Sequence, residues 1–288
     1  MTPSRRIQVV AEDVAFGESP RWHDGRLWFA DWGAREILTV DEAGTKELVL
    51  RVDFPAFPMC LDFLPDGRLL VVAGRDGRLL RREHDGRLVR HADLGALSRH
   101  PWNDIVVDGA GNAYVNNTGF EFPGEKFRPG TVALVTPDGG AREVAHGLAF
   151  PNGMAITPDG RTLIVAESYV GRLTAFDIGE DGDLSDRRIW AELPGSAPDG
   201  ICLDEDGAAW FAEVPGKRCV RVAEGGEVLE TIEHDRGCFA CILGGADRRT
   251  LFFLAQSWGG VQASIAGAGG RTGQVLAVVA PAPSAGRP

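Results

Sequence analysis

A strand–turn–strand unit recurs six times along this chain, and the repeat limits the folds that are available to it. The clearest copy is Phe150–Ala166, in which one apolar run leads into a Pro-Asp-Gly-Arg turn and a second leads out. An Asp-Gly pair between two such runs is a strong local signal of a β-hairpin. The turn recurs at intervals of 41 to 49 residues, at Asp24, Asp66, Ala110, Asp159, Asp206 and Asp247.

A period of this length built from strands is typical of a β-propeller with about four strands per blade. The stretches between successive hairpins supply two further short strands around a polar turn, as in residues 172–193. We therefore predict an all-β, six-bladed propeller of antiparallel strands, with residues 1–280 as a single domain. Residues 7–16 are predicted to pair with Gln274–Ala280, which closes the ring and removes an open sheet edge. The tail, residues 281–288, is predicted to be disordered because its composition buries little apolar area.

Composition and charge exclude several classes of function. The 288 residues carry a formal net charge of -11, whereas a surface for nucleic acid needs clustered Lys and Arg. No apolar run approaches the length of a membrane span, and the first residues lack the apolar core of a signal peptide. Five cysteines suit a reducing cytosol better than a disulfide framework. We expect a cytoplasmic protein with a small-molecule partner and with neither a nucleic-acid nor a membrane partner.

Polar residues occupy equivalent positions just before the first strand of several units. Seven residues before the turn stand Asn103, Asn152 and Asp199, and the shorter first hairpin places Glu18 at the same point. Since the first strand of each propeller blade runs beside the central channel, these residues are predicted to form a ring at its mouth. Two carboxylates and two amides suit a hard divalent cation. The alternative is that they are turn residues at strand entrances.

Four motifs surround these positions in order: GESPRW (17–22), WNDIVVDGAGNAYV (102–115), FPNGMAITPDGRTLIVAES (150–168) and PDGICLDEDGAAWFAE (198–213). They resemble the senescence marker protein/gluconolactonase/luciferin-regenerating enzyme family over about residues 12–280. The resemblance implies a six-bladed propeller with a divalent metal at the channel mouth, commonly hydrolysing lactones. Glu18, Asn152 and Asp199 match the family's metal ligands, and Asn103 matches its substrate-side or fourth ligand. Asp199 also matches its proposed catalytic acid/base. Ca²⁺ is the metal expected first, with Mg²⁺, Mn²⁺, Zn²⁺ or Fe²⁺ as alternatives.

The substrate side departs from that family. Its sugar-lactone members carry an Arg two residues before the ring Asn, where this chain has Pro101. Glu121 falls where those members have a substrate-binding Glu, and aromatic residues around the entrance suit a less polar ligand than an aldonolactone. The predicted substrate-binding residues are Phe57, Arg99, Trp102, Phe120, Glu121, Phe122 and Phe239, with Trp22 and Trp258 as further candidates.

We therefore predict a divalent-metal-dependent lactonase, a carboxylic-ester hydrolase that opens a lactone or a related cyclic ester. The metal would polarise the carbonyl, Asp199 would accept a proton from the attacking water, and Asn103 would orient the carbonyl. One alternative is another enzyme on the same scaffold, such as an organophosphate hydrolase or an isomerising enzyme, and a second is a non-enzymatic metal-binding propeller. Residues 120–130 are predicted to form either a lid over the mouth or a plain connection between strands.

Overall fold

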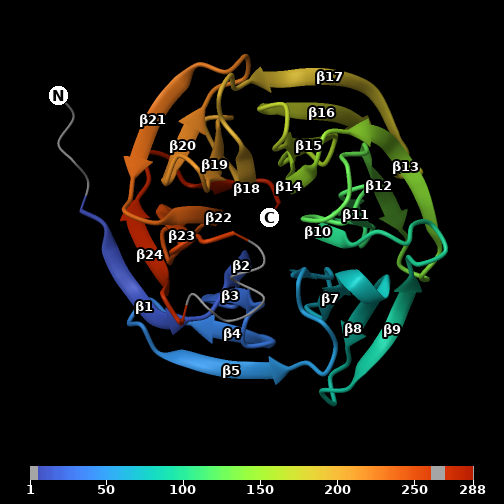
Figure 1. The fold of residues 1–288 in the computed structure, drawn as a ribbon, viewed down its shortest axis with the longest axis horizontal. Helices are drawn as coiled ribbons and strands as arrows, with labels where there is room; N and C mark the ends of the chain where they lie inside the picture. The colour runs from blue at the N-terminus through green and yellow to red at the C-terminus, as the bar shows by residue number, and fades with distance from the viewer. Residues whose placement is uncertain (1–5, 261–269, 288) are drawn as a thin grey trace.

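The computed structural model describes residues 6–260 and 270–287, and within them the chain is a six-bladed β-propeller (Figure 1). Six small antiparallel sheets stand around a central channel, which confirms the fold predicted from the period of the repeat. The only helical segment in the described part of the chain is one 3-10 turn, η1 (Gly74–Asp76). Residues 1–5 and 261–269 of the predicted domain and Pro288 of the predicted tail lie outside the described residues.

Each blade begins with a strand beside the channel, and its later strands lie successively further out (Figure 1). Blades 1 and 2 contain β2 (Gly17–His23), β3 (Arg26–Asp31), β4 (Glu36–Val40), β5 (Lys46–Arg51), β6 (Met59–Phe63), β7 (Leu69–Ala73), β8 (Arg78–Arg82) and β9 (Leu88–Asp93). Blades 3 and 4 contain β10 (Trp102–Val107), β11 (Ala113–Asn117), β12 (Gly130–Val135), β13 (Ala141–Leu148), β14 (Pro151–Ile156), β15 (Thr162–Glu167), β16 (Arg172–Ile178) and β17 (Leu184–Glu192). Blade 5 contains β18 (Pro198–Asp204), β19 (Ala209–Glu213), β20 (Arg218–Val222) and β21 (Val228–Glu233).

Blade 6 combines the two ends of the chain. Its inner strands are β22 (Gly237–Gly244), β23 (Thr250–Gln256) and β24 (Gly273–Val279), and its outer strand is β1 (Gln8–Val14). β1 pairs antiparallel with β24, with Gln8 opposite Ala277. This pairing confirms the predicted closure of the propeller. The inner edge of β1 is hydrogen-bonded to β24 and is therefore not an open sheet edge.

The hydrophobic core lies between neighbouring blades, because both faces of each twisted sheet are covered. The second strands β7 and β19 are buried at every position, so their sequences are apolar runs rather than alternating ones, with the buried Glu213 at the end of β19 as the exception. One cluster of buried side chains joins blades 1 and 2, and others join the following pairs around the ring. Among the described residues, no helix has the length and apolar character needed to span a membrane.

The C-terminal tail is ordered, and the prediction of disorder is wrong for residues 281–287. β25 (Ser284–Ala285) pairs antiparallel with β18, and Arg287 forms a bridge with Ile156 of β14. The inner strands present unpaired backbone groups to the channel, and the tail supplies partners for them. Ala282 and Ala285 are small enough to be buried there. Backbone groups make these bonds, and therefore side-chain composition did not reveal them.

Candidate active site

The four predicted ring residues all lie where the inner strand of a blade shifts its register against the second strand. The shifts fall between Glu18 and Arg21 in blade 1 and at the same place in three other blades; they span Trp102–Ile105, Pro151–Met154 and Pro198–Ile201. Such a bulge re-aims side chains. In blade 2, by contrast, Met59 pairs regularly with Ala73 and no polar side chain joins the ring. The bulges therefore turn the ring side chains toward the channel.

The glycines that follow two ring residues permit close approach of the inner strands. Asn152-Gly153 and Asp199-Gly200 lie inside β14 and β18, and neither glycine has a positive φ. A Cβ on Gly153 would lie 2.5 Å from the carbonyl oxygen of Asp199, and one on Gly200 would lie 2.7 Å from the Cα of Ala240. The alternative that these pairs are turn residues is therefore wrong.

The ring side chains line one cavity at the mouth of the channel. This mouth cavity has a volume of about 210 Å³, and Glu18, Asn103, Asn152 and Asp199 all contribute to it. Asn103 Nδ2 donates a hydrogen bond to Asn152 Oδ1 at 3.2 Å, while Asn152 Nδ2 donates to Ser168 Oγ at 3.3 Å. A volume several times the ~30 Å³ share of a water molecule accommodates a small organic ligand.

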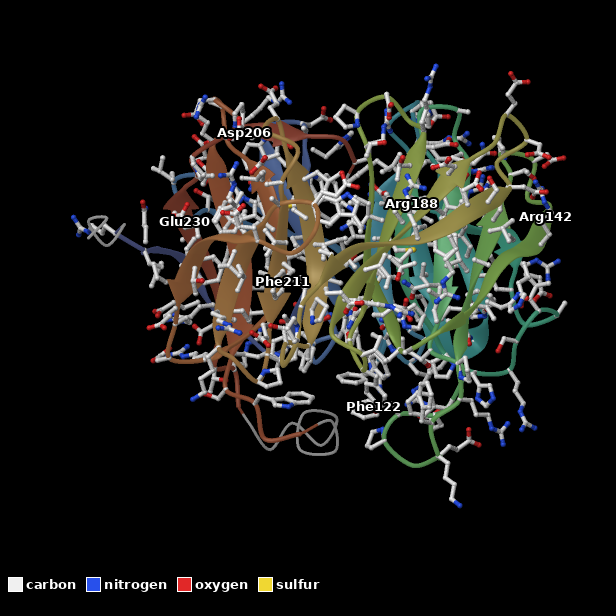
Figure 2. All side chains as sticks on the ribbon, turned by 90° about the horizontal axis from the view of Figure 1, so that it is seen from above. Phe122, Arg142, Arg188, Asp206, Phe211 and Glu230 are labelled. Atoms are coloured by element: carbon white, nitrogen blue, oxygen red, sulfur yellow. The ribbon has the colours of Figure 1, made fainter. Side chains whose placement is uncertain are left out.

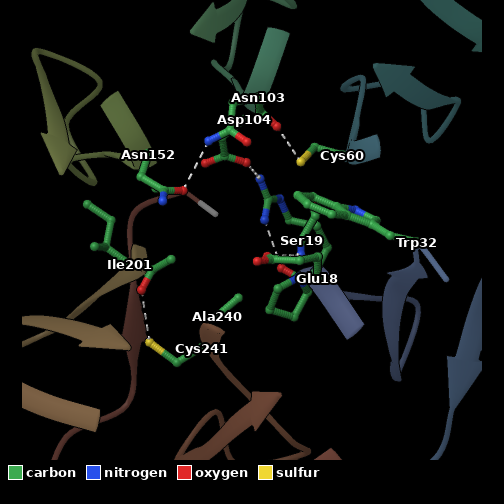
Figure 3. Close-up of a pocket in the computed structure, with 14 residues that line it drawn as sticks. Glu18, Ser19, Trp32, Cys60, Asn103, Asp104, Asn152, Ile201, Ala240 and Cys241 are labelled. Carbon is green, nitrogen blue, oxygen red and sulfur yellow. Dashed lines mark hydrogen bonds and ion pairs between the residues drawn. The ribbon is translucent and has the colours of Figure 1, made fainter. Parts of the chain in front are cut away.

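Three of the ring residues also line a second, enclosed space deeper in the channel. Figure 3 shows Glu18, Asn103 and Asn152 directed toward this space together with Asp104. Its volume is about 20 Å³. One water-sized sphere requires roughly 10–15 Å³, so the space suits a single ion or water molecule.

A column of charged side chains, which sequence reasoning missed, supports the ring from below. The guanidinium of Arg21 lies 3.4 Å from Asp62 and 3.7 Å from Asp104, and all three residues are buried. Asp104 accepts a hydrogen bond from the backbone N–H of Met154, and Asp62 accepts one from Val107. Arg21 and Asp104 lie on inner strands that carry ring residues, and Asp62 lies on the inner strand of blade 2. These positions on inner strands are the sequence signal that could have identified them.

Burial and mutual repulsion favour the protonated forms of the carboxyl groups at the ring. Burial raises the pKa of Glu18 to about 8. A hydrogen bond from the backbone N–H of Ser19 lowers this pKa, and the negative charge of Asp104 raises it further. Burial, followed by the charges of Glu18 and Asp104, raises the pKa of Asp199 well above its ordinary value. Burial likewise raises the pKa of Asp104 to about 6, although the charge of Arg21 opposes it. Negative charge at this point therefore needs a counter-charge.

The ring fits a divalent cation. A cation among Glu18, Asn103, Asn152 and Asp199 would relieve the repulsion between the carboxylates. The ion-sized space lies next to three of these four residues, and Asp199 faces the mouth cavity above it. In the described part of the chain, no three His, Cys, Asp or Glu side chains are grouped to hold a metal, so the amide oxygens would have to share in binding. A donor set made only of oxygen suits Ca²⁺ or Mg²⁺.

Of the predicted substrate-binding residues, Phe57, Phe122 and Phe239 line the mouth cavity, as does Trp258. Figure 2 shows Phe122 at one face of the propeller, opposite the face that carries Asp206. These aromatic side chains therefore gather at the open end of the channel, next to the ring.

The other predicted substrate-binding residues lie outside the cavity lining. Trp102 is 1% exposed and packs between blades 2 and 3, because successive residues of a strand point to opposite sides and Asn103 faces the channel. Phe120 is buried behind the rings of Phe122 and Phe150. Arg99 is exposed on the connection before β10 and does not line the mouth cavity.

Two further sequence assignments require correction. Glu121 does not line the cavity; it accepts a hydrogen bond at 2.6 Å from Arg75, which does. Trp22 stacks on Phe252 at the far end of the inner strand, with ring centroids 5.3 Å apart. It is absent from the mouth cavity because β2 carries it to the opposite face of the propeller.

Sequence reasoning missed one wall-forming pattern. In every blade, a residue just after the second strand lines the mouth cavity, because that strand returns the chain to the ring end. These residues are Trp32, Arg75, Thr118, Ser168, Val214 and Trp258. The same repeat alignment that located the ring would have located them.

Residues 16–257 match the SMP-30/Gluconolactonase/LRE-like region, and the chain therefore belongs to this family. It is 26% identical to regucalcin of Gallus gallus over 267 residues, which cover 89% of this chain and 88% of that protein. It is 27% identical to 6-deoxy-6-sulfogluconolactonase of Pseudomonas putida over 254 residues, which cover 86% and 85% of the two chains. The structure of a luciferin-regenerating enzyme superposes with a TM-score of 0.82 over 98% of both chains at 17% identity, which supports the propeller fold.

Proposed function

We propose that this protein is a divalent-metal-dependent lactonase that opens a lactone or related cyclic ester at the mouth cavity. The observation that carries the proposal is the convergence of four oxygen-bearing side chains from four blades between an ion-sized space and a ligand-sized cavity. Membership of the gluconolactonase-like family and the lactonase name of one relative support the same chemistry.

Glu18, Asn103, Asn152 and Asp199 would hold the cation, and Ca²⁺ is the first candidate because every donor is oxygen. A divalent cation in this position supplies Lewis-acid polarisation of a carbonyl oxygen. Alternatives to be tested are Mg²⁺, Mn²⁺, Zn²⁺ and Fe²⁺.

The chain's own residues perform the proton transfer and the orientation. Asp199 accepts the proton of the attacking water as the water oxygen bonds to the carbonyl carbon, and it returns that proton to the leaving alkoxide oxygen when the ester C–O bond breaks. It is assigned this role because it is the ring carboxylate that lines the mouth cavity but not the deeper space. The amide of Asn103 donates a hydrogen bond to the carbonyl oxygen as negative charge develops on it. The apolar walls exclude bulk water, which strengthens both interactions.

The test combines metal titration with turnover. Chelated protein is titrated calorimetrically with each cation and assayed on sugar, aliphatic and aromatic lactones. Asp199→Asn is expected to lose turnover by at least about 100-fold while the fold survives, because an amide cannot accept the proton. Asp24→Asn is the matched control, because Asp24 is an exposed carboxylate at the turn end of blade 1. Full turnover in Asp199→Asn, or turnover that survives chelation, would refute the mechanism.

We also propose a cytoplasmic location. The five cysteines are buried and unpaired, which suits a reducing compartment. Measuring thiol content in protein purified from its native cells tests this, since disulfide-linked cysteines would contradict it.

A further inference from the structure

We infer that the substrate is a lactone with a flat aromatic body and that Arg75 binds an acceptor oxygen on the body, away from the ester group. This inference rests on the proposed function and specifies the class of substrate that the same site takes. Three observations support the inference: two aromatic walls line the mouth cavity, few polar groups lie between them, and Arg75 is held in a fixed position.

The first aromatic wall covers blades 1, 2 and 6 at the channel mouth. Phe16 lies at its centre: it stacks on Trp32 at 5.3 Å and meets Phe57 and Phe239 edge to face at 5.1 and 4.8 Å. Trp258 adds a further edge contact and remains 38% exposed. All five rings line the mouth cavity.

The second aromatic wall belongs to blades 3 and 4. Phe150 stacks on Tyr169 with centroids 4.8 Å apart, and Phe122 meets the Phe150 ring edge to face at 5.2 Å. Phe122 and Tyr169 are 37% and 48% exposed, which leaves aromatic surface available to a ligand. Exposed aromatic surface of this kind in a cavity marks a binding site for an apolar group.

Phe150 is held in a strained backbone conformation. Its φ is +61°, which a residue with a Cβ rarely adopts, and the strain is maintained by a hydrogen bond from the backbone N–H of Ser168 to the Phe150 carbonyl. Such strain concentrates at ligand-binding sites, where the surroundings fix it. The aromatic side chain of Phe150 therefore faces the cavity in one fixed position.

Few hydrogen-bond donors are available between the walls. Apart from the ring residues, the polar side chains lining the mouth cavity are Arg75, Thr118, Ser168 and Tyr169, and the indole N–H groups of Trp32 and Trp258 also belong to lining residues. The indole N–H of Trp32 donates to the carbonyl of Met59. The Thr118 hydroxyl donates to the carbonyl of Phe120 at 2.8 Å, and the Ser168 hydroxyl donates to that of Pro198 at 2.7 Å. An aldonolactone would place several hydroxyl groups against aromatic rings, and each unmatched hydroxyl weakens binding by about tenfold.

Arg75 is the one charged donor among the described lining residues, and it is fixed in position while still having N–H groups to spare. Its Nε donates to the carbonyl of Phe57 at 2.8 Å, and its Nη2 donates to Glu121 at 2.6 Å. A guanidinium has five N–H groups, and Nη1 has no hydrogen-bond partner within the described part of the chain. Glu121 is thus a positioning residue that holds Arg75 at the edge of the cavity, where Nη1 can bind an acceptor oxygen of the ligand.

The experiment compares three probes in the metal-loaded enzyme: dihydrocoumarin, a dihydrocoumarin bearing a carboxylate on its aromatic ring, and gluconolactone. The expected kcat/KM is at least about tenfold higher for both aromatic lactones than for gluconolactone. Arg75→Met is expected to raise KM for the carboxylate-bearing lactone by about 10- to 100-fold with kcat nearly unchanged, and to leave dihydrocoumarin within about twofold. Arg188→Met is the matched control, because Arg188 forms a similar ion pair, with Asp177, on the outer strand of blade 4.

Binding of the ring-opened products separates this inference from the proposed hydrolase. The hydroxy acids formed from both aromatic lactones are titrated into the protein while tryptophan fluorescence, to which Trp32 and Trp258 contribute, is recorded. Binding that Arg75→Met weakens, without hydrolysis of any probe, would retain the aromatic subsite and refute the lactonase. Preference for gluconolactone, or an equal effect of Arg75→Met on all three probes, would overturn the inference.

Discussion

Gly153→Ala tests whether close approach of the inner strands sets the geometry of the ring. Gly153 follows Asn152 in β14 and faces the backbone of β18 next to Asp199. An added methyl group would lie 2.5 Å from the Asp199 carbonyl oxygen and 2.6 Å from the backbone nitrogen of Ile201. Ordinary contacts are about 3.5 Å, so the two strands must separate by about 1 Å.

A backbone shift of this size has two measurable costs. Forcing an extra methyl into a packed site destabilises a protein by about 1–3 kcal/mol, or roughly 2–4 °C of Tm per kcal/mol at this chain length. A displacement of about 1 Å at a reacting centre also lowers turnover by roughly 100-fold. Since Asn152 and Asp199 lie on the two separating strands, the affinity for the cation should fall by at least about tenfold.

Gly160→Ala provides the matched control in the same hairpin. Gly160 occupies the turn between β14 and β15 with a φ of +72°, and an added Cβ would meet nothing within 4 Å. Strain in the left-handed region costs about 1–2 kcal/mol, so both variants are expected to melt earlier by similar amounts. Thermal unfolding, calcium titration and lactonase assays would compare them. Unchanged cation affinity and turnover in Gly153→Ala would refute the link between strand spacing and the ring.

Two further predictions concern stability. Glu167 is fully buried, and burial raises its pKa, but hydrogen bonds from Thr174, the Ala149 N–H and Arg172 outweigh this and lower it below its ordinary value of 4.5. Glu167→Gln should therefore lower the free energy of unfolding, measured in urea at neutral pH, by about 3 kcal/mol. The difference between variant and wild type should shrink as pH falls below 4.5, because the stabilising ionised form is then lost. A difference that does not depend on pH would contradict the assignment. Removing residues 281–288 deletes backbone bonds such as those between Arg287 and Ile156, each contributing about 1 kcal/mol, and should lower Tm by several degrees; an unchanged melting curve would show that the tail adds nothing.

The repeat made the fold predictable. Turn residues, apolar runs and a period of 41 to 49 residues are signals readable in the sequence, and together they indicated the strands, the six blades and the pairing of β1 with β24. The positions of Glu18, Asn103, Asn152 and Asp199 followed as well, because equivalent positions of a closed repeat must surround one axis.

The remaining errors arise where side-chain direction depends on tertiary contacts. Trp102 neighbours a ring residue in sequence, yet the strand turns it into the core between blades. Arg75 lies in a turn without any motif, and only its contacts with Phe57 and Glu121 place it at the cavity. The tail carries few apolar side chains, and its order comes from backbone pairing with β18.

The ordered tail determines by which end of the channel small molecules enter and leave. It crosses the far end of the channel (Figure 1). The buried side chains of Arg21, Asp62 and Asp104 lie between that end and the ring. A small molecule that enters the mouth cavity must therefore leave by the same opening. Because substrate and product pass through the same opening of the channel, the ring-opened acid should act as a competitive inhibitor. The rate at which this product dissociates past the aromatic walls sets an upper limit on turnover.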